Sequence, residues 1–407
     1  MTAVGPQDLA VVRGLAERVA ELAHSDEYER RRRRWRDVNG LRRADRAPVW
    51  CRPARVWPET IPQDSLRCED PFCRQVEYAL RQHLWKDSVG DDSLVEPWWD
   101  VPAVFDCDSE HVWGLPTAQL VATTSLGGWR YDPPLKTDDD FARVTIPTFT
   151  YNEARTHEAL ERAHDLLRDV LPVRMTCDSP LGAGLGTPLD QLRGMEAMLL
   201  DLALRPHLVH GLMAKLLEGT LRAMRVAEAT GLLTANHYGP MTCSDPISGE
   251  PPPGEVRLHH LWAVANSQEF QEVSPAMWEE FLLSYQMPIF QQYGLVQYGC
   301  CENLTRKIAG VLRIPNLRVF VCSAWTDLGQ VIEACGDRTT IMWRQKASDV
   351  TFAGDLSATR RHLEEGMRRL QGCRYQVVLR EIETLAGHPR RLHDWARVAI
   401  EVAEQWA

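Results

Sequence analysis

Lysine is scarce in this chain of 407 residues, where only positions 86, 136, 215, 307 and 346 are lysine among 46 basic residues. Acidic residues number 56, so the formal net charge is -10 at pH 7. A negative protein is repelled by nucleic-acid backbones and by anionic membrane surfaces. We therefore expect neither nucleic acid nor membrane as a partner, and we examine each remaining lysine that falls near a predicted site.

Long apolar runs are also lacking. No segment approaches the roughly 20 apolar residues that a membrane-spanning helix needs. The opening residues, MTAVGPQDLA, do not show the basic, apolar and small-residue order of a signal peptide. The 11 cysteines are odd in number and scattered, which favours reduced thiols over a disulfide framework. We expect a cytoplasmic protein.

The N-terminal residues are predicted to be helical. Apolar residues recur at three- and four-residue spacing from residue 7 to about 45, which predicts a helical leader over residues 1–45. The arginine run 30–34 continues this helix. We interpret it as a solvated helix face paired with the acidic residues just before it, rather than as a nucleic-acid patch.

From residue 46 onwards, short β-rich segments alternate with helical ones, which is typical of a parallel sheet. One long helical region is predicted from Pro188 to about Ala229 with a break at Arg205-Pro206, and another helix begins at Ser274-Pro275. The strands expected are Pro48–Cys51, Leu94–Trp99, Pro172–Cys177, Leu258–Asn266, Leu295–Cys300, Leu317–Cys322, Thr339–Trp343 and Tyr375–Ile382.

Eight strands alternating with helices are the pattern of a (β/α)8 TIM barrel. The sequence therefore predicts an α/β fold in which residues 46–407 form the barrel and the helical leader packs on it. Segments 100–170 and 236–256 show little periodicity and are rich in Pro, Gly and Asp. We expect them to be long loops over the barrel mouth.

Reactive groups of such a barrel lie at the carboxyl ends of its strands. There the sequence places Cys300-Cys301-Glu302, together with Glu269, Tyr298, Lys346, Glu381 and Glu383. Thiolates and carboxylates from neighbouring strand ends can hold Zn²⁺ with one position open for substrate. The same carboxylates can instead be salt-bridge partners of nearby arginines.

Two other patterns are weighed as sites. His259-His260 are of a metal-ligating type, but they stand at the start of their predicted strand, far from its active end. The glycines of segment 182–186 are spaced GxGxG and not GxGxxG, and Asp201 is predicted to be mid-helix. Phosphate binding at the N-terminus of the following helix is kept as an alternative.

Several strings resemble the uroporphyrinogen decarboxylase superfamily over residues 40 to 405. They are the helix that begins at Arg193-Gly-Met-Glu, the helix start Val273-Ser-Pro-Ala-Met-Trp-Glu-Glu-Phe, and Gly294 before a strand that leads to a cysteine-containing turn. Cys68-Glu-Asp-Pro-Phe, Glu96-Pro-Trp-Trp-Asp-Val-Pro and Tyr298-Gly-Cys-Cys-Glu resemble a branch found beside corrinoid methyltransfer proteins.

This resemblance implies one of two chemistries. The first is cofactor-free decarboxylation, in which arginines hold substrate carboxylates; Pro48-Val-Trp-Cys-Arg-Pro-Ala-Arg resembles the start of that motif, with Arg52 and Arg55 as the clamps. The second is zinc-dependent methyl transfer between a corrinoid protein and a thiol or methoxyl group. The family's zinc-binding turn matches Tyr298-Gly299-Cys300, so the cysteine carries over and the histidine does not, and Glu381 or Glu383 stands where the family has a cysteine.

We predict a metal-dependent methyltransferase that moves a methyl group between a small methylated substrate and a corrinoid protein or thiol. The alternative is a decarboxylase or lyase acting on a small carboxylic acid. Zinc is the predicted cofactor, a separate protein would supply the corrinoid, and a homodimer is expected. Predicted metal ligands are Cys300, Cys301, Glu302 and Glu383; predicted catalytic residues are Glu269, Lys346, Glu381 and Tyr298; predicted substrate-binding residues are Arg52, Arg55, Trp343, His237 and Tyr238.

Overall fold

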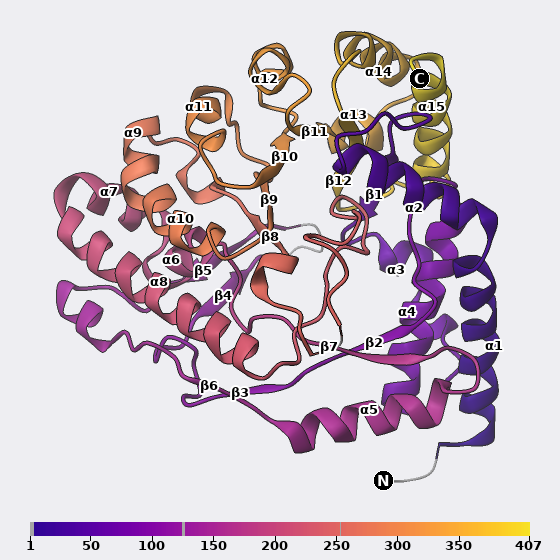
Figure 1. Cartoon of the computed structure of the whole chain (residues 1–407), viewed down its shortest axis with the longest axis horizontal. Helices are drawn as coiled ribbons and strands as arrows, with labels where there is room; N and C mark the ends of the chain where they lie inside the picture. The colour runs from indigo at the N-terminus through magenta and orange to yellow at the C-terminus, as the bar shows by residue number, and fades with distance from the viewer. Residues whose placement is uncertain (1–3, 124–126, 253) are drawn as a thin grey trace.

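A curled sheet of six parallel strands is the centre of the fold in the computed structural model, which describes residues 4–123, 127–252 and 254–407. The strand order is β1-β12-β11-β10-β9-β8, so the first strand pairs with the last. Figure 1 shows the helices that connect these strands along the outside of the curve. The strands are β1 (Val49–Pro53), β8 (Trp262–Ala265), β9 (Leu295–Tyr298), β10 (Leu317–Cys322), β11 (Thr340–Gln345) and β12 (Tyr375–Ile382).

Two further parallel strands, β2 (Trp99–Pro102) and β7 (Val173–Thr176), pair with each other. Together with the six-stranded sheet they are the counterparts of the eight predicted strands, and β10 and β12 have the predicted bounds. The prediction of Leu94–Trp99 was wrong apart from its last residue. The carbonyl of Val95 in that segment accepts a hydrogen bond from the Arg32 side chain, and the carbonyl of Ser93 just before it accepts one from Arg31.

The helical region after β7 breaks at Arg205-Pro206 as predicted and also at Gly194, which was not predicted. Helices α6 (Gly186–Arg193), α7 (Met195–Leu204) and α8 (Pro206–Ala229) are separated by Gly194 and by Arg205 before Pro206. The helix that begins after Ser274 has its N-terminus capped by that serine, whose hydroxyl accepts from Met277 N at 3.2 Å. It runs through α9 (Pro275–Trp278), a π-helical turn η5 (Glu279–Leu283) and α10 (Ser284–Phe290).

The C-terminal strands are linked by shorter helices. These are α11 (Ile308–Val311), α12 (Leu328–Cys335), α13 (Ala347–Thr351) and α14 (Ser357–Arg369), and α15 (Arg391–Gln405) ends the chain. Short helical turns are α3 (Trp57–Thr60), η1 (Gln63–Ser65), η2 (Asp138–Arg143), η3 (Leu258–His260), η4 (Gln268–Phe270) and η6 (Thr305–Lys307). No helix in the described ranges is both long and apolar enough to cross a bilayer.

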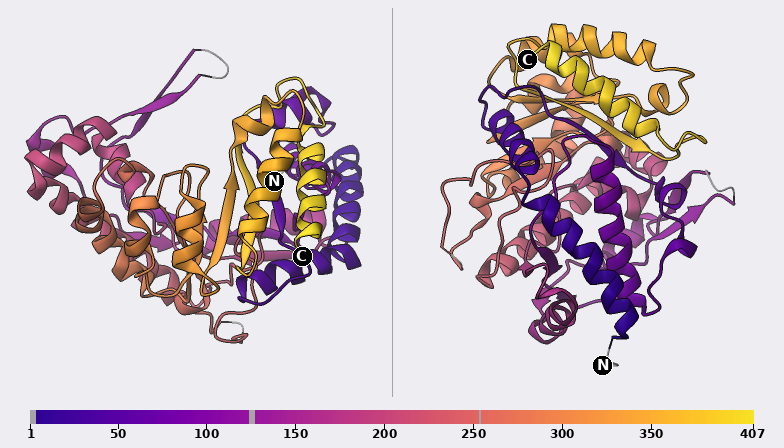
Figure 2. Two further views of the ribbon diagram at one scale, coloured as in Figure 1. Left: turned by 90° about the horizontal axis from the view of Figure 1, so that it is seen from above. Right: turned by 90° about the vertical axis from the view of Figure 1, so that its right-hand side faces the viewer.

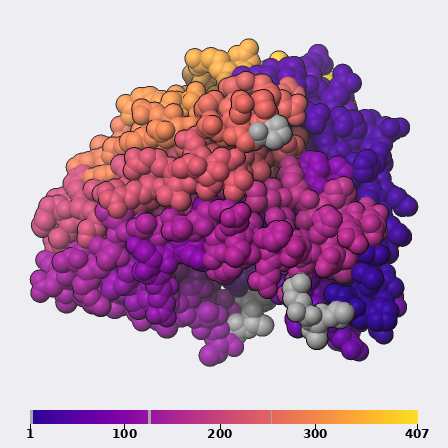
Figure 3. All heavy atoms as spheres, turned by 60° about the horizontal axis from the view of Figure 1, so that its bottom comes forward, coloured from indigo at the N-terminus to yellow at the C-terminus, as the bar shows by residue number. Residues whose placement is uncertain are grey.

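The predicted leader consists of two helices, α1 (Pro6–Ala23) and α2 (Asp26–Asn39); its residues 1–3 lie outside the described part. Helix α1 packs against α4 (Pro71–Ser88) and α5 (Glu153–Leu167) around an apolar cluster of its own, separate from the main core. Figure 3 shows a face built mainly from these N-terminal and central segments, with the C-terminal segments at its upper edge.

The prediction of a solvated arginine face on α2 was right for Arg30 and Arg33, which are exposed, and Arg30 pairs with Glu27 as expected, but it was wrong for the other three arginines. Arg31, Arg32 and Arg34 are buried, and their guanidinium groups bond to the segment 91–95 that follows α4. Trp35 adds a hydrogen bond to the Asp92 carbonyl at 2.8 Å. The run therefore fixes the chain beside β1 and offers no basic surface from these three residues.

Segment 100–170 contains regular structure where loops were expected; residues 124–126 within it, and residue 253 within segment 236–256, are not described. Strand β3 (Phe105–Cys107) pairs antiparallel with β6 (Phe149–Tyr151), and β4 (Ala118–Val121) pairs with β5 (Trp129–Asp132). The β4–β5 hairpin extends away from the body of the molecule (Figure 2). Helix α5 then follows, with Asn152 as its N-cap.

A tight contact between α14 and β11 gives a test of this packing. A Cβ atom at Gly366 would lie 2.0 Å from the buried indole ring of Trp343. Because the added methyl group would force the Trp343 ring or the helix to shift, Gly366→Ala should lower the free energy of unfolding by about 1–3 kcal/mol. Gly354→Ala, where nothing lies within 4 Å of the added Cβ, is the matched control in a urea titration. Equal losses in both variants would contradict this packing.

Candidate active site at the ends of β9, β11 and β12

Two adjacent thiols follow β9. Gly299 turns the chain after Tyr298, with φ of 112°, and a Cβ there would lie 2.9 Å from Val321 Cβ, so the turn needs glycine. The turn brings Cys300 and Cys301 side by side with their sulfur atoms 3.6 Å apart. The loop after the strand thus presents both thiols at the carboxyl edge of the sheet.

A carboxylate from β12 completes the cluster. Cys300, Cys301 and Glu381 each offer one ligand atom, and the three atoms lie within 4.8 Å of one another. Glu381 has φ of 58°, a left-handed conformation that non-glycine residues rarely adopt. It stands where the β1–β12 register shifts, which turns its side chain toward the thiols.

Two arginines surround these donors. Arg344 Nη1 on β11 lies 3.5 Å from Cys300 Sγ, 3.8 Å from Cys301 Sγ and 3.5 Å from Glu381 Oε1. Arg380 Nε lies 3.5 Å from the same carboxylate oxygen. Burial lowers the pKa of Arg380, and the neighbouring Arg344 charge lowers it further. No role in the site was predicted for these two arginines, although each is close in sequence to a predicted catalytic residue, Lys346 or Glu381.

The thiols differ in acidity. The hydrogen bond from the Cys301 thiol lowers the pKa of Cys300 to about 6, with further lowering by the Arg344 and Arg380 charges. The same hydrogen bond and burial raise the pKa of Cys301. In this arrangement Cys300 is the thiolate and Cys301 is the donor.

This asymmetry predicts the pH dependence of alkylation. In metal-free protein, the rate at which iodoacetamide modifies Cys300 should rise with pH and reach half its maximum near pH 6, because only the thiolate is nucleophilic. Mass spectrometry of the modified peptide gives the rate. Arg344→Gln should move the midpoint upward. A midpoint near that of a free thiol in the unsubstituted protein would contradict the assignment.

Glu302 lies beside the thiols but is used by the backbone. Its carboxylate, 1% exposed, accepts hydrogen bonds from the backbone N–H groups of Ser267 and Cys300, each at 2.8 Å, and from the Ser267 hydroxyl at 3.2 Å. It joins the end of β8 to the turn after β9. The structure does not place it in the three-residue cluster.

Glu269 and Tyr298 are buried near the same edge. Burial raises the pKa of Glu269, whose Oε1 accepts from the Thr187 hydroxyl at 2.7 Å and whose other oxygen has no partner among the described residues. The Tyr298 hydroxyl lies in the core, accepts from Trp278 Nε1 and donates to Gln286 Oε1, each at 3.1 Å. These contacts hold Tyr298 as part of the packed interior.

Arg52 and Glu383 lie on the other side of Glu381. Arg52, Lys86, Arg380, Glu381 and Glu383 line a cavity of about 560 Å³. Arg55, which was also predicted to bind substrate, pairs with Glu383 at 3.1 Å, and both of these side chains are half exposed. Glu383 is therefore turned to the surface and is not placed with the thiols.

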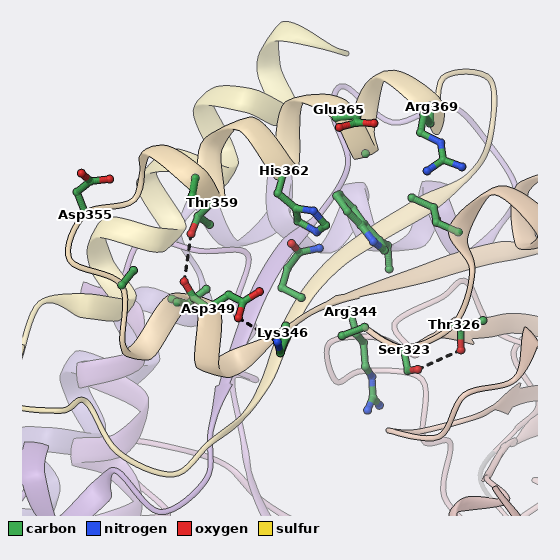
Figure 4. A pocket seen from close by; sticks show the side chains of 18 of the residues that line it. Ser323, Thr326, Arg344, Lys346, Asp349, Asp355, Thr359, His362, Glu365 and Arg369 are labelled. Carbon is green, nitrogen blue, oxygen red and sulfur yellow. Dashed lines mark hydrogen bonds and ion pairs between the residues drawn. The ribbon is translucent and has the colours of Figure 1, made fainter. Parts of the chain in front are cut away.

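Trp343 and Lys346 belong to a larger cavity of about 770 Å³ between β11 and α14. Figure 4 shows His362 of α14 directed toward this space, while the Arg344 guanidinium points away from that helix. Lys346 lies 3.3 Å from Asp349, and its ammonium is 5.2 Å from the centre of the Trp325 ring. Lys346 also lines a smaller cavity that reaches Cys301.

The remaining predicted residues lie elsewhere. His237 and Tyr238 line a cavity of about 350 Å³ with His260 and Arg174, whose guanidinium stacks 4.9 Å from the Tyr238 ring centre. His259 and His260 lie in η3 before β8, and not within the strand as predicted, but they are at the end of that strand away from the thiols. The glycine-rich segment 182–186 leads into α6, and a Cβ at Gly186 would meet the Glu269 carboxylate at 2.4 Å, so this glycine makes room for that side chain.

Comparison with known proteins gives a similarity of structure alone. No protein-family model and no curated protein matches the sequence. A solved structure, a methyltransferase from Methanosarcina mazei, superimposes with a TM-score of 0.53 over 92% of this chain and 98% of that chain, at 10% sequence identity. The two proteins share a fold. At this identity the similarity concerns the fold and not the site.

Proposed function

We propose that this protein is a methyltransferase that moves a methyl group between a small methylated substrate and a thiol or a corrinoid protein. The observation that carries the proposal is the convergence of Cys300, Cys301 and Glu381 at the carboxyl ends of β9 and β12. The fold shared with a methyltransferase supports this class of reaction. The sequence resemblance to the uroporphyrinogen decarboxylase superfamily supports it independently.

The three donors suit Zn²⁺. A tetrahedral ion with Zn–S bonds of about 2.3 Å needs sulfur atoms about 3.8 Å apart, and the sulfurs here are 3.6 Å apart. Three protein ligands leave the fourth position for a substrate, as in catalytic zinc sites. Arg344 Nη1 contacts all three donors, which marks the place as favourable for a positive charge. A bound ion would displace this N–H group.

The surrounding residues would position the ligands. Glu302 fixes the Cys300 backbone, and Gly299 allows the turn that brings both sulfurs forward. Arg380 holds Glu381 toward the thiols. When bound, zinc would supply a Lewis acid that withdraws charge from the heteroatom bearing the methyl group or favours a thiolate acceptor.

Metal analysis tests the proposal. Protein purified without a histidine tag should contain about one zinc per chain, as a single catalytic site requires. The Cys300→Ala and Cys301→Ala variants should contain almost none. The zinc-loaded enzyme should transfer methyl groups from methoxyl, methylamine or thioether donors to free cob(I)alamin, followed by absorbance. Zinc retained in both cysteine variants would contradict this site.

The proposal includes a closed (β/α)8 barrel. Thr234 N donates to the Cys177 carbonyl at 3.0 Å just beyond β7, and the Asn236 side chain bonds to both backbone groups of Trp262 in β8. These contacts support residues 233–236 as the link between β7 and the six-stranded sheet. The thiols would then lie at the barrel mouth, as expected for the active site of this fold.

A lyase acting on a small carboxylic acid is the second candidate. The observation that favours it is the cavity in which Arg52, Lys86 and Arg380 stand beside Glu381, since guanidinium groups bind carboxylates and the glutamate can move a proton. This function requires no metal. Decarboxylation of a small acid by protein treated with a chelator would favour it over methyl transfer.

A further inference from the structure

Arg344 is buried and only partly satisfied. Its side chain is 3% exposed, and Nη1 faces the two thiols and Glu381. The other edge of the guanidinium, formed by Nε and Nη2, has no hydrogen-bond partner within the described residues. Burying charged N–H groups without acceptors is costly. The Nε–Nη2 edge is also the one that binds a carboxylate with two parallel hydrogen bonds.

A small cavity adjoins this arginine. It has a volume of about 200 Å³, and its wall includes Cys301, Ser323, Trp325, Arg344, Lys346 and Glu381. Arg344 and Lys346 bring two positive charges against the single carboxylate of Glu381, which Arg380 also contacts. Asp349, which pairs with Lys346 at 3.3 Å, lines the larger neighbouring cavity and not this one. The wall of the small cavity therefore contains two cationic side chains and one carboxylate.

We infer that this cavity binds the carboxylate of a small organic anion between Arg344 and Lys346, and that the substrate or acceptor of the site belongs to this class. The inference rests on the proposed function. A carboxylate held there would leave the rest of a short molecule beside Cys301 and Glu381 and over the Trp325 ring. The Nε and Nη2 atoms of Arg344 are themselves enclosed, so the guanidinium would have to turn into the cavity for this edge to meet the carboxylate.

A purely structural role for Arg344 is the competing explanation. In that case the guanidinium serves only as the counter-charge of the Cys300 thiolate, and its free edge has no ligand. The two explanations differ in whether a carboxylate binds and whether Arg344 controls that binding. The two explanations predict the same zinc content for the wild-type protein.

Calorimetry with matched probes distinguishes them. Acetate, methylthioacetate and 3-(methylthio)propanoate would each be titrated into the full-length protein and compared with the neutral alcohol of the same length. We expect at least one carboxylate to bind about 10-fold or more tightly than its alcohol, because only the anion can accept charged hydrogen bonds. Equal binding of each pair, or no binding of any carboxylate, would overturn the inference.

Variants locate the contact. Arg344→Gln should weaken carboxylate binding about 10- to 100-fold. Lys346→Gln, at a more exposed position, should weaken it about 3- to 10-fold and serves if Arg344→Gln does not fold. Arg369→Gln is the control, because Arg369 lines only the larger cavity. Unchanged affinity in Lys346→Gln and Arg344→Gln, or loss in Arg369→Gln alone, would overturn the assignment.

Zinc content measured on the same samples separates this inference from the proposed function. Carboxylate binding that depends on Arg344 in a protein without zinc would support the anion site and contradict the zinc methyltransferase. Stoichiometric zinc without a preference for carboxylates would support the zinc site and contradict the anion site.

Discussion

Replacing Asp92 with alanine should lower the free energy of unfolding by about 3–5 kcal/mol, because buried Arg46 would lose its carboxylate partner and buried Arg34 would lose one of its two. The Asp92 side chain is 1% exposed and pairs with Arg34 and Arg46, whose side chains are 8% and 9% exposed. It also accepts a hydrogen bond from Val49 N at 2.7 Å. The substitution would therefore leave two guanidinium groups and the first N–H of β1 without this acceptor.

Asp45→Ala is the matched control. Asp45 also pairs with Arg34, at 2.6 Å, but its side chain is 61% exposed, so we expect a loss of about 1 kcal/mol or less. Urea titrations of both variants, followed by circular dichroism, measure the difference. Similar losses in the two variants would show that the buried cluster is not what holds α2 against β1.

The contact matters for the site because β1 is the neighbour of β12. Val49, which follows the leader, pairs in register with Val377 of β12, and β12 ends at Ile382, one residue after Glu381. Loosening of the Asp92 cluster should therefore spread along β1 toward the thiols. We therefore expect Asp92→Ala to lose zinc only to the extent that the protein loses stability.

The strands of the sheet could be predicted from sequence because apolar runs bounded by turn residues are a local signal. Leu317–Cys322 and Tyr375–Ile382 were predicted with the bounds observed. The segment Leu94–Trp99 shows where that signal fails. It is apolar enough for a strand, but arginines on the distant helix α2 bind the carbonyls of Val95 within it and of Ser93 just before it, and nothing local in the sequence reveals those partners.

Helix α5 was missed although its signal was present. Asn152 caps it by accepting from Arg155 N at 2.9 Å, and the residues that follow are mostly strong helix formers. Its apolar face is short, because its buried apolar residues, Ala163, Leu166 and Leu167, all lie in the second half of the helix. Periodicity alone therefore gave too little weight to this helix.

The site could be predicted only in part. Position after a strand singled out Cys300, Cys301 and Glu381, and the structure brings these three together. Sequence could not show which of several nearby carboxylates faces the thiols, since that depends on backbone geometry at single residues. The positive φ of Glu381 and the hydrogen bonds of Glu302 decide it, and neither can be derived from residue type.

Glu381→Gln should reduce zinc affinity by more than about 100-fold, because loss of a direct ligand should exceed the 10- to 100-fold typical of residues that only support ligands. Glu302→Gln should fall within that lower range, since Glu302 fixes the Cys300 backbone without facing the ion. Glu383→Gln should have little effect, because Glu383 is half exposed and pairs with Arg55.

Competition with a chromophoric zinc chelator gives the three affinities on folded protein. The rank order of the three losses in zinc affinity is more informative than their sizes. Each variant removes one negative charge, so any long-range electrostatic effect on zinc binding is common to all three. If Glu383→Gln caused the greatest loss, the exposed carboxylate would have to turn inward and release Arg55 to bind zinc. If Glu302→Gln did, the ion would lie between β8 and β9, and Glu381 would be left as a partner of Arg344 and Arg380 alone.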